Sequence, residues 1–163
     1  RLKDRQKSLV ENALCARVFT RLYRLTGNED YARTARATLE AFAASYPMMG
    51  YFAAGYAQAV DLLLQAPAEV NIVGDPADGV TQALLAAALR LNVPGREVQV
   101  LHPQRDARRL KALMLPAEPS SVAYVCYGSA CSPPLNDPEA LAATVESMGK
   151  ASVLAQELGE GRD

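Results

Sequence analysis

Cys126, Cys131 and His102 are the side chains best placed in this sequence for redox or metal chemistry, since the third cysteine, Cys15, lies far from them on a predicted helix. Cys126 and Cys131 are separated by four residues, and His102 is the single histidine. A zinc site needs about four nitrogen or sulfur ligands, more than these three residues supply. Thioredoxin-type redox pairs have two intervening residues at a helix start, whereas Pro133-Pro134 follows this pair. We therefore interpret Cys126 as a buried strand-end residue and Cys131 as part of a turn, with a metal or redox role as the alternative.

His102 has no serine or cysteine nucleophile motif beside it, which favours a structural role. The run at 74–79, Gly-Asp-Pro-Ala-Asp-Gly, precedes a predicted helix and resembles half of a phosphate loop. It lacks the lysine and the glycine order of such loops, and its two aspartates would repel an anion. A turn followed by a helix N-cap at Asp78 explains the run without a ligand. The sequence thus offers no complete active site, and we expect no catalysis by this chain alone, no metal and no cofactor.

Helical periodicity fills the sequence as far as Pro67. A capping box begins at Ser8, Gly27 supplies a left-handed stop, and Pro47 ends a second helical pattern. Because the link at Gly27 is very short, the first two helices must be antiparallel neighbours. The predicted helices cover 9–26, 28–46 and 51–64.

An apolar stripe runs along one face of the first predicted helix and has no obvious partner within the chain. The other helices also have broad apolar faces, so we expect them to be covered by polypeptide outside this sequence, which we take to be a piece of a longer protein. The stripe consists of Val10, Leu14, Val18, Leu22 and Leu25.

Charge is uneven along the chain, with a net of +5 over 1–36 and −6 over the remainder. Arg17, Arg21 and Arg24 share one helix face, which suggests either a nucleic-acid patch or a solvated surface. We prefer the solvated surface because no aromatic residues interleave with the arginines. There is no membrane-length apolar run and no secretory signal. We therefore expect a cytoplasmic protein with free thiols that binds neither nucleic acid nor membranes.

After Pro67, short β-branched runs alternate with helical patterns. Short connections between such elements imply parallel pairing and right-handed crossovers. We predict an α/β fold in which antiparallel helices pack with a small three-stranded parallel βαβαβα unit. The loops that hold His102 and the two cysteines would then meet at one sheet edge. The predicted strands are 69–73, 97–101 and 122–127, and the predicted parts are a helical segment at 1–66, the α/β unit at 67–149 and a tail at 150–163.

Several segments in a fixed order carry a family resemblance. They are RQKSLVENA at 5–13, LTGNEDY at 25–31, GYFAAGYA at 50–57, the stretch 67–74, and the C-x4-C-x-P ending within 124–134. Over roughly residues 5–148 the chain resembles the carboxyl-terminal region of the thioredoxin-domain-containing, YyaL-like family, the relatives of spermatogenesis-associated protein twenty.

The resemblance implies a longer parent with an amino-terminal thioredoxin-like domain and an α/α toroid similar to sugar epimerases and six-hairpin glycosidases. This chain would hold the toroid's last helices, and no catalytic residue carries over to it. We expect a structural or interaction module whose partner is the remainder of the parent chain or a second copy. The alternatives are a wall of a carbohydrate isomerase or epimerase pocket at 48–51, and a thiol redox or metal site at Cys126 and Cys131.

Overall fold

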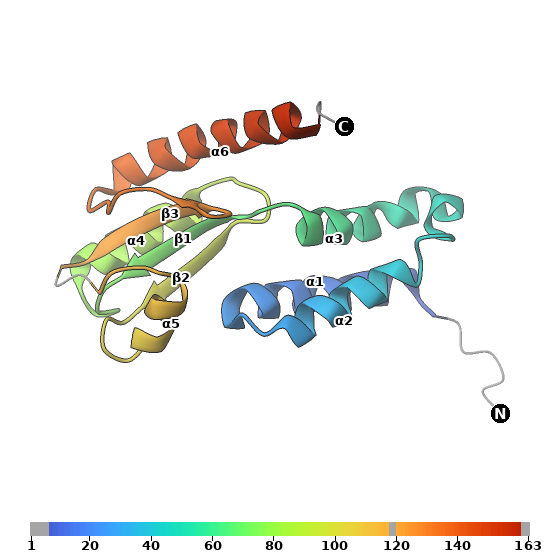
Figure 1. The fold of residues 1–163 in the computed structure, drawn as a ribbon, viewed down its shortest axis with the longest axis horizontal. Coiled ribbons are helices and arrows are strands. Elements are labelled where there is room, and N and C mark those ends of the chain that lie inside the picture. The colour runs from blue at the N-terminus through green and yellow to red at the C-terminus, as the bar shows by residue number, and fades with distance from the viewer. Residues whose placement is uncertain (1–6, 118–119, 161–163) are drawn as a thin grey trace. The chain divides into compact units, whose positions relative to one another are not determined.

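The fold is mixed α/β and divides into two compact units, Arg1–Gln65 and Ala66–Asp163 (Figure 1). The computed structural model describes residues 7–117 and 120–160, with side chains described as far as residue 151. In these described ranges, no helix combines the length and the apolar character needed to cross a bilayer.

The first unit is helical, and its boundaries follow local capping signals. The Ser8 side chain accepts a hydrogen bond from the amide of Glu11, and the Asn28 side chain accepts one from the amide of Asp30. Gly27 has the predicted left-handed conformation, with φ 72°. The first helix therefore has its predicted bounds. The second ends at Glu40 instead of continuing to 46, and a 3₁₀ segment replaces the predicted first residues of the third. The elements are α1 (Leu9–Thr26), α2 (Glu29–Glu40), η1 (Tyr46–Ala53) and α3 (Ala54–Leu64).

Small residues of α1 make its packed face. Ala13 and Ala16 are buried, which lets the backbones of the neighbouring helices approach closely. The predicted stripe lies on another face of the same helix: Leu14 is 58% exposed and Val18 is 49% exposed. The helix thus has one apolar face in the core and a second in solvent. The core of the unit consists of Leu9, Ala13, Ala16, Ala35, Leu39, Phe42, Tyr56 and Ala59.

The second unit holds a four-stranded mixed sheet rather than the predicted three-stranded parallel one. The strands are β1 (Ala68–Val73), β2 (Glu97–Leu101), β3 (Val122–Tyr127) and β4 (Ala130–Cys131), in the order β2-β1-β3-β4. The β1–β2 pair is parallel, with Val70 opposite Val98, as predicted. The prediction for β3 is wrong, because β3 runs antiparallel to β1 with Val70 opposite Val125.

The lengths of the two connecting helices agree with the reversal of β3. Helix α4 (Gly79–Arg90) has 12 residues and so covers about 18 Å, enough to return from the end of β1 to the start of β2. Helix α5 (Ala107–Ala112) has six residues and covers only about 9 Å. A strand of five residues such as β2 is about 16 Å long. The short helix therefore leaves the chain near the edge where β2 ended, and β3 starts there.

Helices cover both faces of this sheet. On one face Val70 and Ile72 pack with Leu84 of α4 and Leu141 of α6 (Pro138–Glu160). On the other face Leu110 of α5 packs with a second cluster of strand residues. Helix α6 continues to Glu160, so the expected tail from 150 is helical over most of its length.

Candidate functional site

A pocket of about 590 Å³ lies where the parallel strands β1 and β2 end. Parallel pairing brings the run at 74–79 and His102 together at this edge, as predicted for these two segments. Because β3 is antiparallel, the residues just before it join these two segments at the pocket. The lining residues are Gly74, Asp75, Asp78, Val80, His102, Pro103, Gln104, Ser120 and Ser121.

Two aspartates in the pocket organise the turn that leads into α4. Asp75 Oδ1 accepts a hydrogen bond of 2.8 Å from the amide of Ala77. Asp78 Oδ2 accepts bonds of 3.1 Å from the amides of Val80 and Thr81, which makes Asp78 the predicted N-cap. A hydrogen bond with the Ser121 side chain, followed by these amide bonds, holds the pKa of Asp78 below its ordinary value. The Asp78 carboxylate is therefore ionised at neutral pH.

Gly74 lets three elements meet at the base of the pocket. The Thr81 hydroxyl donates a hydrogen bond of 2.8 Å to Ser121 Oγ, which links α4 to the residue before β3. A β-carbon at Gly74 would collide with Thr81 Oγ1 and would come within 2.5 Å of Ser121 Oγ. The absence of a side chain at this position is thus required by close approach.

His102 has defined partners in the turn after β2. Its amide donates a hydrogen bond of 2.7 Å to Asp106 Oδ2. Its ring Nδ1 accepts bonds from the amides of Gln104, at 3.2 Å, and Arg105, at 3.3 Å. A nitrogen that accepts these bonds carries no proton, so Nε2 bears the proton of the neutral imidazole and is the ring's remaining donor.

The pocket can therefore hydrogen-bond a polar molecule through carboxylates, hydroxyls and an imidazole N–H. The carboxylates of Asp75 and Asp78 both line it, so the expectation that the run at 74–79 repels phosphate stays a prediction. Within the described ranges, no group of three or more His, Cys, Asp or Glu side chains is arranged to hold a metal ion.

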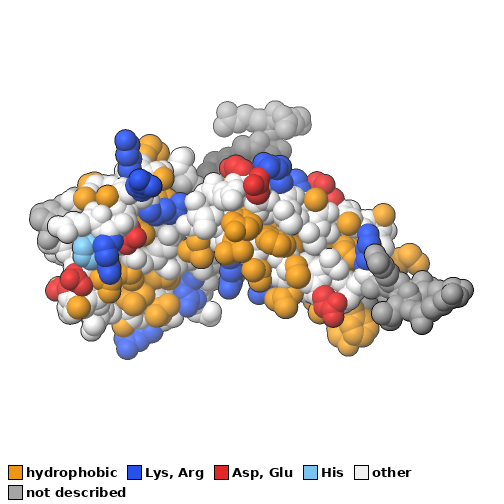
Figure 2. All heavy atoms as spheres, turned by 90° about the horizontal axis from the view of Figure 1, so that it is seen from below, with side chains coloured by type: hydrophobic (Ala, Val, Ile, Leu, Met, Phe, Trp, Pro, Cys, Tyr) orange, Lys and Arg blue, Asp and Glu red, His pale blue; other side chains and the backbone are white. Residues whose placement is uncertain are grey.

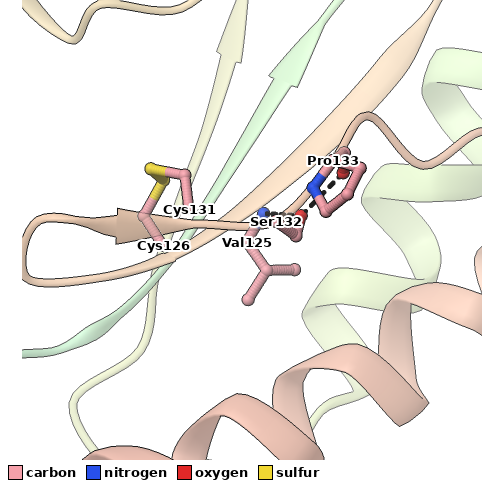
Figure 3. The surroundings of a disulfide bond; sticks show 5 residues. All are labelled: Val125, Cys126, Cys131, Ser132 and Pro133. Atoms are coloured by element: carbon pink, nitrogen blue, oxygen red, sulfur yellow. Dashed lines mark hydrogen bonds between the residues drawn. A yellow bond between two sulfur atoms is a disulfide. The ribbon is translucent and has the colours of Figure 1, made fainter.

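The two cysteines lie at the opposite edge of the sheet and form a disulfide (Figure 3). The expectations of free thiols at these positions, and of a shared edge with His102, are therefore wrong. Cys126 and Cys131 are paired across β3 and β4 with a Cα–Cα distance of 4.1 Å. Gly128, with φ 57°, begins the two-residue turn between the strands, where glycine is favoured. Cys15 is the free cysteine, and it is exposed.

The hairpin exposes one sulfur-bearing residue and buries the other. Cys126 is 5% exposed, whereas Cys131 lies in the exposed strand β4. Ser132 secures the chain after β4, since its hydroxyl accepts a bond of 3.1 Å from the amide of Val125 and donates one of 2.8 Å to the carbonyl of Pro133 (Figure 3). Disulfide exchange from solvent would thus have Cys131 as its accessible end.

A third candidate surface is the exposed apolar part of the helical unit. On the face drawn in Figure 2, hydrophobic side chains gather over this unit. In η1, Met48 is 90% exposed and Tyr51 is 79% exposed, and the ring of Tyr51 lies against that of Phe52 with centroids 4.1 Å apart. The helical unit thus exposes large apolar side chains both in η1 and along the stripe on α1.

Sequence reasoning missed three hydroxyl residues of the pocket region and the disulfide. Ser120 and Ser121 join the pocket only because β3 starts at this edge, which depends on strand direction, and Thr81 of α4 contacts Ser121 there. The disulfide had a usable signal: a Gly-Ser pair lies midway between the two cysteines, and such pairs mark two-residue hairpins. Comparison of the chain with models of protein families, with curated proteins and with solved structures finds no match.

Proposed function

We propose that this chain is an interaction module that binds polypeptide through the second apolar face of α1. The observation that carries this proposal is that α1 already has a packed face, yet leaves Val10, Leu14 and Val18 about half or more exposed. Surface apolar residues placed singly are ordinary, whereas a stripe along one helix is typical of an interface.

In a more specific version of this proposal, the chain is part of a larger parent protein, and its helical unit closes the end of an α/α toroid. The family resemblance of the helical segments supports this form, and so does the pairing of α1 with α2 around Gly27. The partner is then the remainder of the parent chain. A second copy of this chain is the other partner compatible with the same surface.

The test is the double variant L14E/V18E, which places two carboxylates in the centre of the stripe. The chain is mixed with the polypeptide encoded upstream of it in the same reading frame, and binding and self-association are measured by sedimentation velocity. We expect wild type to form at least one of these assemblies and the variant to weaken it by more than tenfold, because burying an unpaired charge is costly.

The matched control is T34E/T38E, which adds the same charge to α2 with the same spacing of four residues. Its assembly should equal that of wild type. Identical assembly by wild type and L14E/V18E, or no assembly with either partner, would refute the proposal.

A second candidate function is thiol–disulfide exchange at the hairpin, which the disulfide and the exposure of Cys131 favour. A thiolate from a dithiol reductant would attack Cys131 Sγ, forming a mixed disulfide and releasing Cys126 as a thiolate. The second thiol of the reductant then displaces Cys131, so that the reductant is oxidised and both cysteines are reduced.

Titration with a dithiol redox buffer, read out by mass spectrometry after alkylation, tests this candidate. A midpoint inside the range of protein oxidoreductases, roughly −120 to −270 mV, supports exchange as a function. A midpoint below about −300 mV would show a structural disulfide instead.

The carbohydrate alternative is favoured by Tyr51 and Phe52, whose exposed rings offer a stacking surface. Under this alternative, sugars should raise the unfolding temperature of the chain, and Y51A should abolish the shift. The absence of a shift with a panel of hexoses and amino sugars would remove it.

A further inference from the structure

We propose that a second copy of this chain covers the exposed face of α1, with the two α1 helices packed antiparallel about a twofold axis. This inference rests on the proposed function, because it names the partner of the same surface.

The first argument is the spacing of the exposed residues. Glu11, Leu14, Val18 and Arg21 are all exposed, and they follow one another at intervals of three, four and three residues. That alternation keeps the residues on one narrow line along a helix, the seam by which two helices pack side by side. Val10 and Leu25, which are 60% and 44% exposed, extend the apolar surface beside the two ends of this line.

The second argument is that the seam is complementary to itself when reversed. Its midpoint is level with Ala16: Leu14 and Val18 lie about 3 Å to either side along the axis, and Glu11 and Arg21 lie about 7.5 Å to either side. A twofold axis at the midpoint therefore places Leu14 of one copy opposite Val18 of the other. The same operation places Glu11 opposite Arg21, twice per dimer.

Charge selects this orientation over the parallel one. In a parallel pair in register, Glu11 would face Glu11 of the second copy, and Arg21 would face Arg21, so both contacts would be repulsive. The antiparallel pair converts both into attractive contacts. Arg17 lies at the edge of the seam and is partly buried. The twofold axis brings the two Arg17 residues to the same side, where their long side chains have to turn away from each other.

Cys15 provides an independent marker of the geometry. It is exposed and free, and it lies on the other edge of the seam, one residue from the midpoint. In the antiparallel dimer the two Cys15 residues are therefore near the axis on the same side. A bifunctional maleimide with a reach of about 10 Å should join them.

The decisive experiment is a charge exchange on the full chain, measured by sedimentation equilibrium. E11R alone puts four positive charges at the interface and R21E alone puts four negative charges there, so each variant should dimerise at least about tenfold more weakly than wild type. An equimolar mixture of the two should form a heterodimer, and the double variant E11R/R21E should recover wild-type dimerisation.

The control R36E changes an exposed charge on α2 and should leave dimerisation unchanged. Maleimide cross-linking of wild type should yield a covalent dimer that C15S does not form. A monomeric wild type, or E11R and R21E homodimers as tight as wild type, would overturn the inference. If the chain is monomeric but binds the upstream polypeptide, the dimer inference is wrong and the proposed function still holds.

Discussion

The α/β unit encloses nearly all of its large hydrophobic side chains, whereas the helical unit leaves many of its own exposed. Of the large hydrophobic residues that are exposed in the described part of the chain, ten belong to the helical unit and three to the α/β unit. The largest fully buried aliphatic residues, such as Ile72, Leu84 and Leu141, all belong to the α/β unit. The core of the helical unit is half alanine.

The difference shows how one chain can contain a closed core and an open one. A sheet covered on both faces by helices surrounds its branched residues and completes its own packing. Three helices that meet through Ala13, Ala16, Ala35 and Ala59 approach closely but bury little area, so their larger side chains remain available to a partner. Substitutions of buried residues should therefore have the larger effect on the stability of the α/β unit. Substitutions of exposed apolar residues should mainly change how the helical unit associates.

The largest effect should come from a truncation inside the closed core. Ile72 is fully buried between β-strands and helices, so I72A should lower the free energy of unfolding by about 2–5 kcal/mol. L14A, at a position that is 58% exposed, should change it by less than about 0.5 kcal/mol in the monomer. Urea unfolding followed by circular dichroism measures both. Equal losses in the free energy of unfolding for I72A and L14A would show that the two units do not differ in this way.

Adding a methyl group at the base of the pocket should have the next largest effect. G74A places a β-carbon against Thr81 and Ser121, which cannot both move without breaking their hydrogen bond. We expect a loss of about 1–3 kcal/mol in the same unfolding measurement. G55A is the matched control, because a β-carbon at Gly55 meets nothing within 4 Å. A stable G74A would show that the closed unit is looser than its packing indicates.

A smaller loss should follow removal of the buried hydroxyl in the helical unit. Tyr56 is 5% exposed, and its hydroxyl donates a hydrogen bond of 2.9 Å to the carbonyl of Leu39. Y56F should cost about 1 kcal/mol, the usual contribution of such a bond. Burial, followed by the charge of nearby Tyr46, raises the pKa of Tyr56, so its absorbance should titrate above the ordinary tyrosine value. Titration of Tyr56 at the ordinary value would show that this core is open to water.

The smallest effect concerns the charge at the start of α4. The pKa of Asp78 is lowered by Ser121 and by helix amides, so the ionised form stabilises the fold above the unfolded-state pKa of about 3.9. D78N keeps the shape of the cap without the charge, and should unfold about 1–3 °C below wild type at pH 7. The difference should narrow as the pH falls through the lowered pKa. A difference that does not narrow as the pH is lowered would assign the effect to shape rather than charge.

Local signals in the sequence were enough to place most helix and strand ends. Ser8, Gly27, Asn28 and Asp78 act on neighbouring backbone groups, and each has its predicted role in the structure. The bounds of β2 and β3 were also predicted correctly, because runs of β-branched residues identify strands without knowledge of their neighbours.

Long-range features were harder to predict. The direction of β3 depends on where the connection through α5 returns the chain to the sheet, and the short length of α5 is a weak signal of that. A helix with two apolar faces does not reveal which one is packed, so the exposure of Leu14 required the structure. The pocket was predicted in part: the run at 74–79 and His102 meet as expected, while Ser121 arrives through the reversal of β3.

The segment after the cysteine hairpin has a consequence for how chains can aggregate. From Ala130 to Leu135 the backbone follows the outer side of β3, and hydrogen bonds between Leu135 and Ala123 close its far end. Two of its residues are Pro133 and Pro134, which have no amide hydrogen to offer an approaching strand. A foreign β-strand would therefore find an interrupted row of donors at this border of the sheet. The molecule is protected there against the fibre-like stacking that open sheet borders invite.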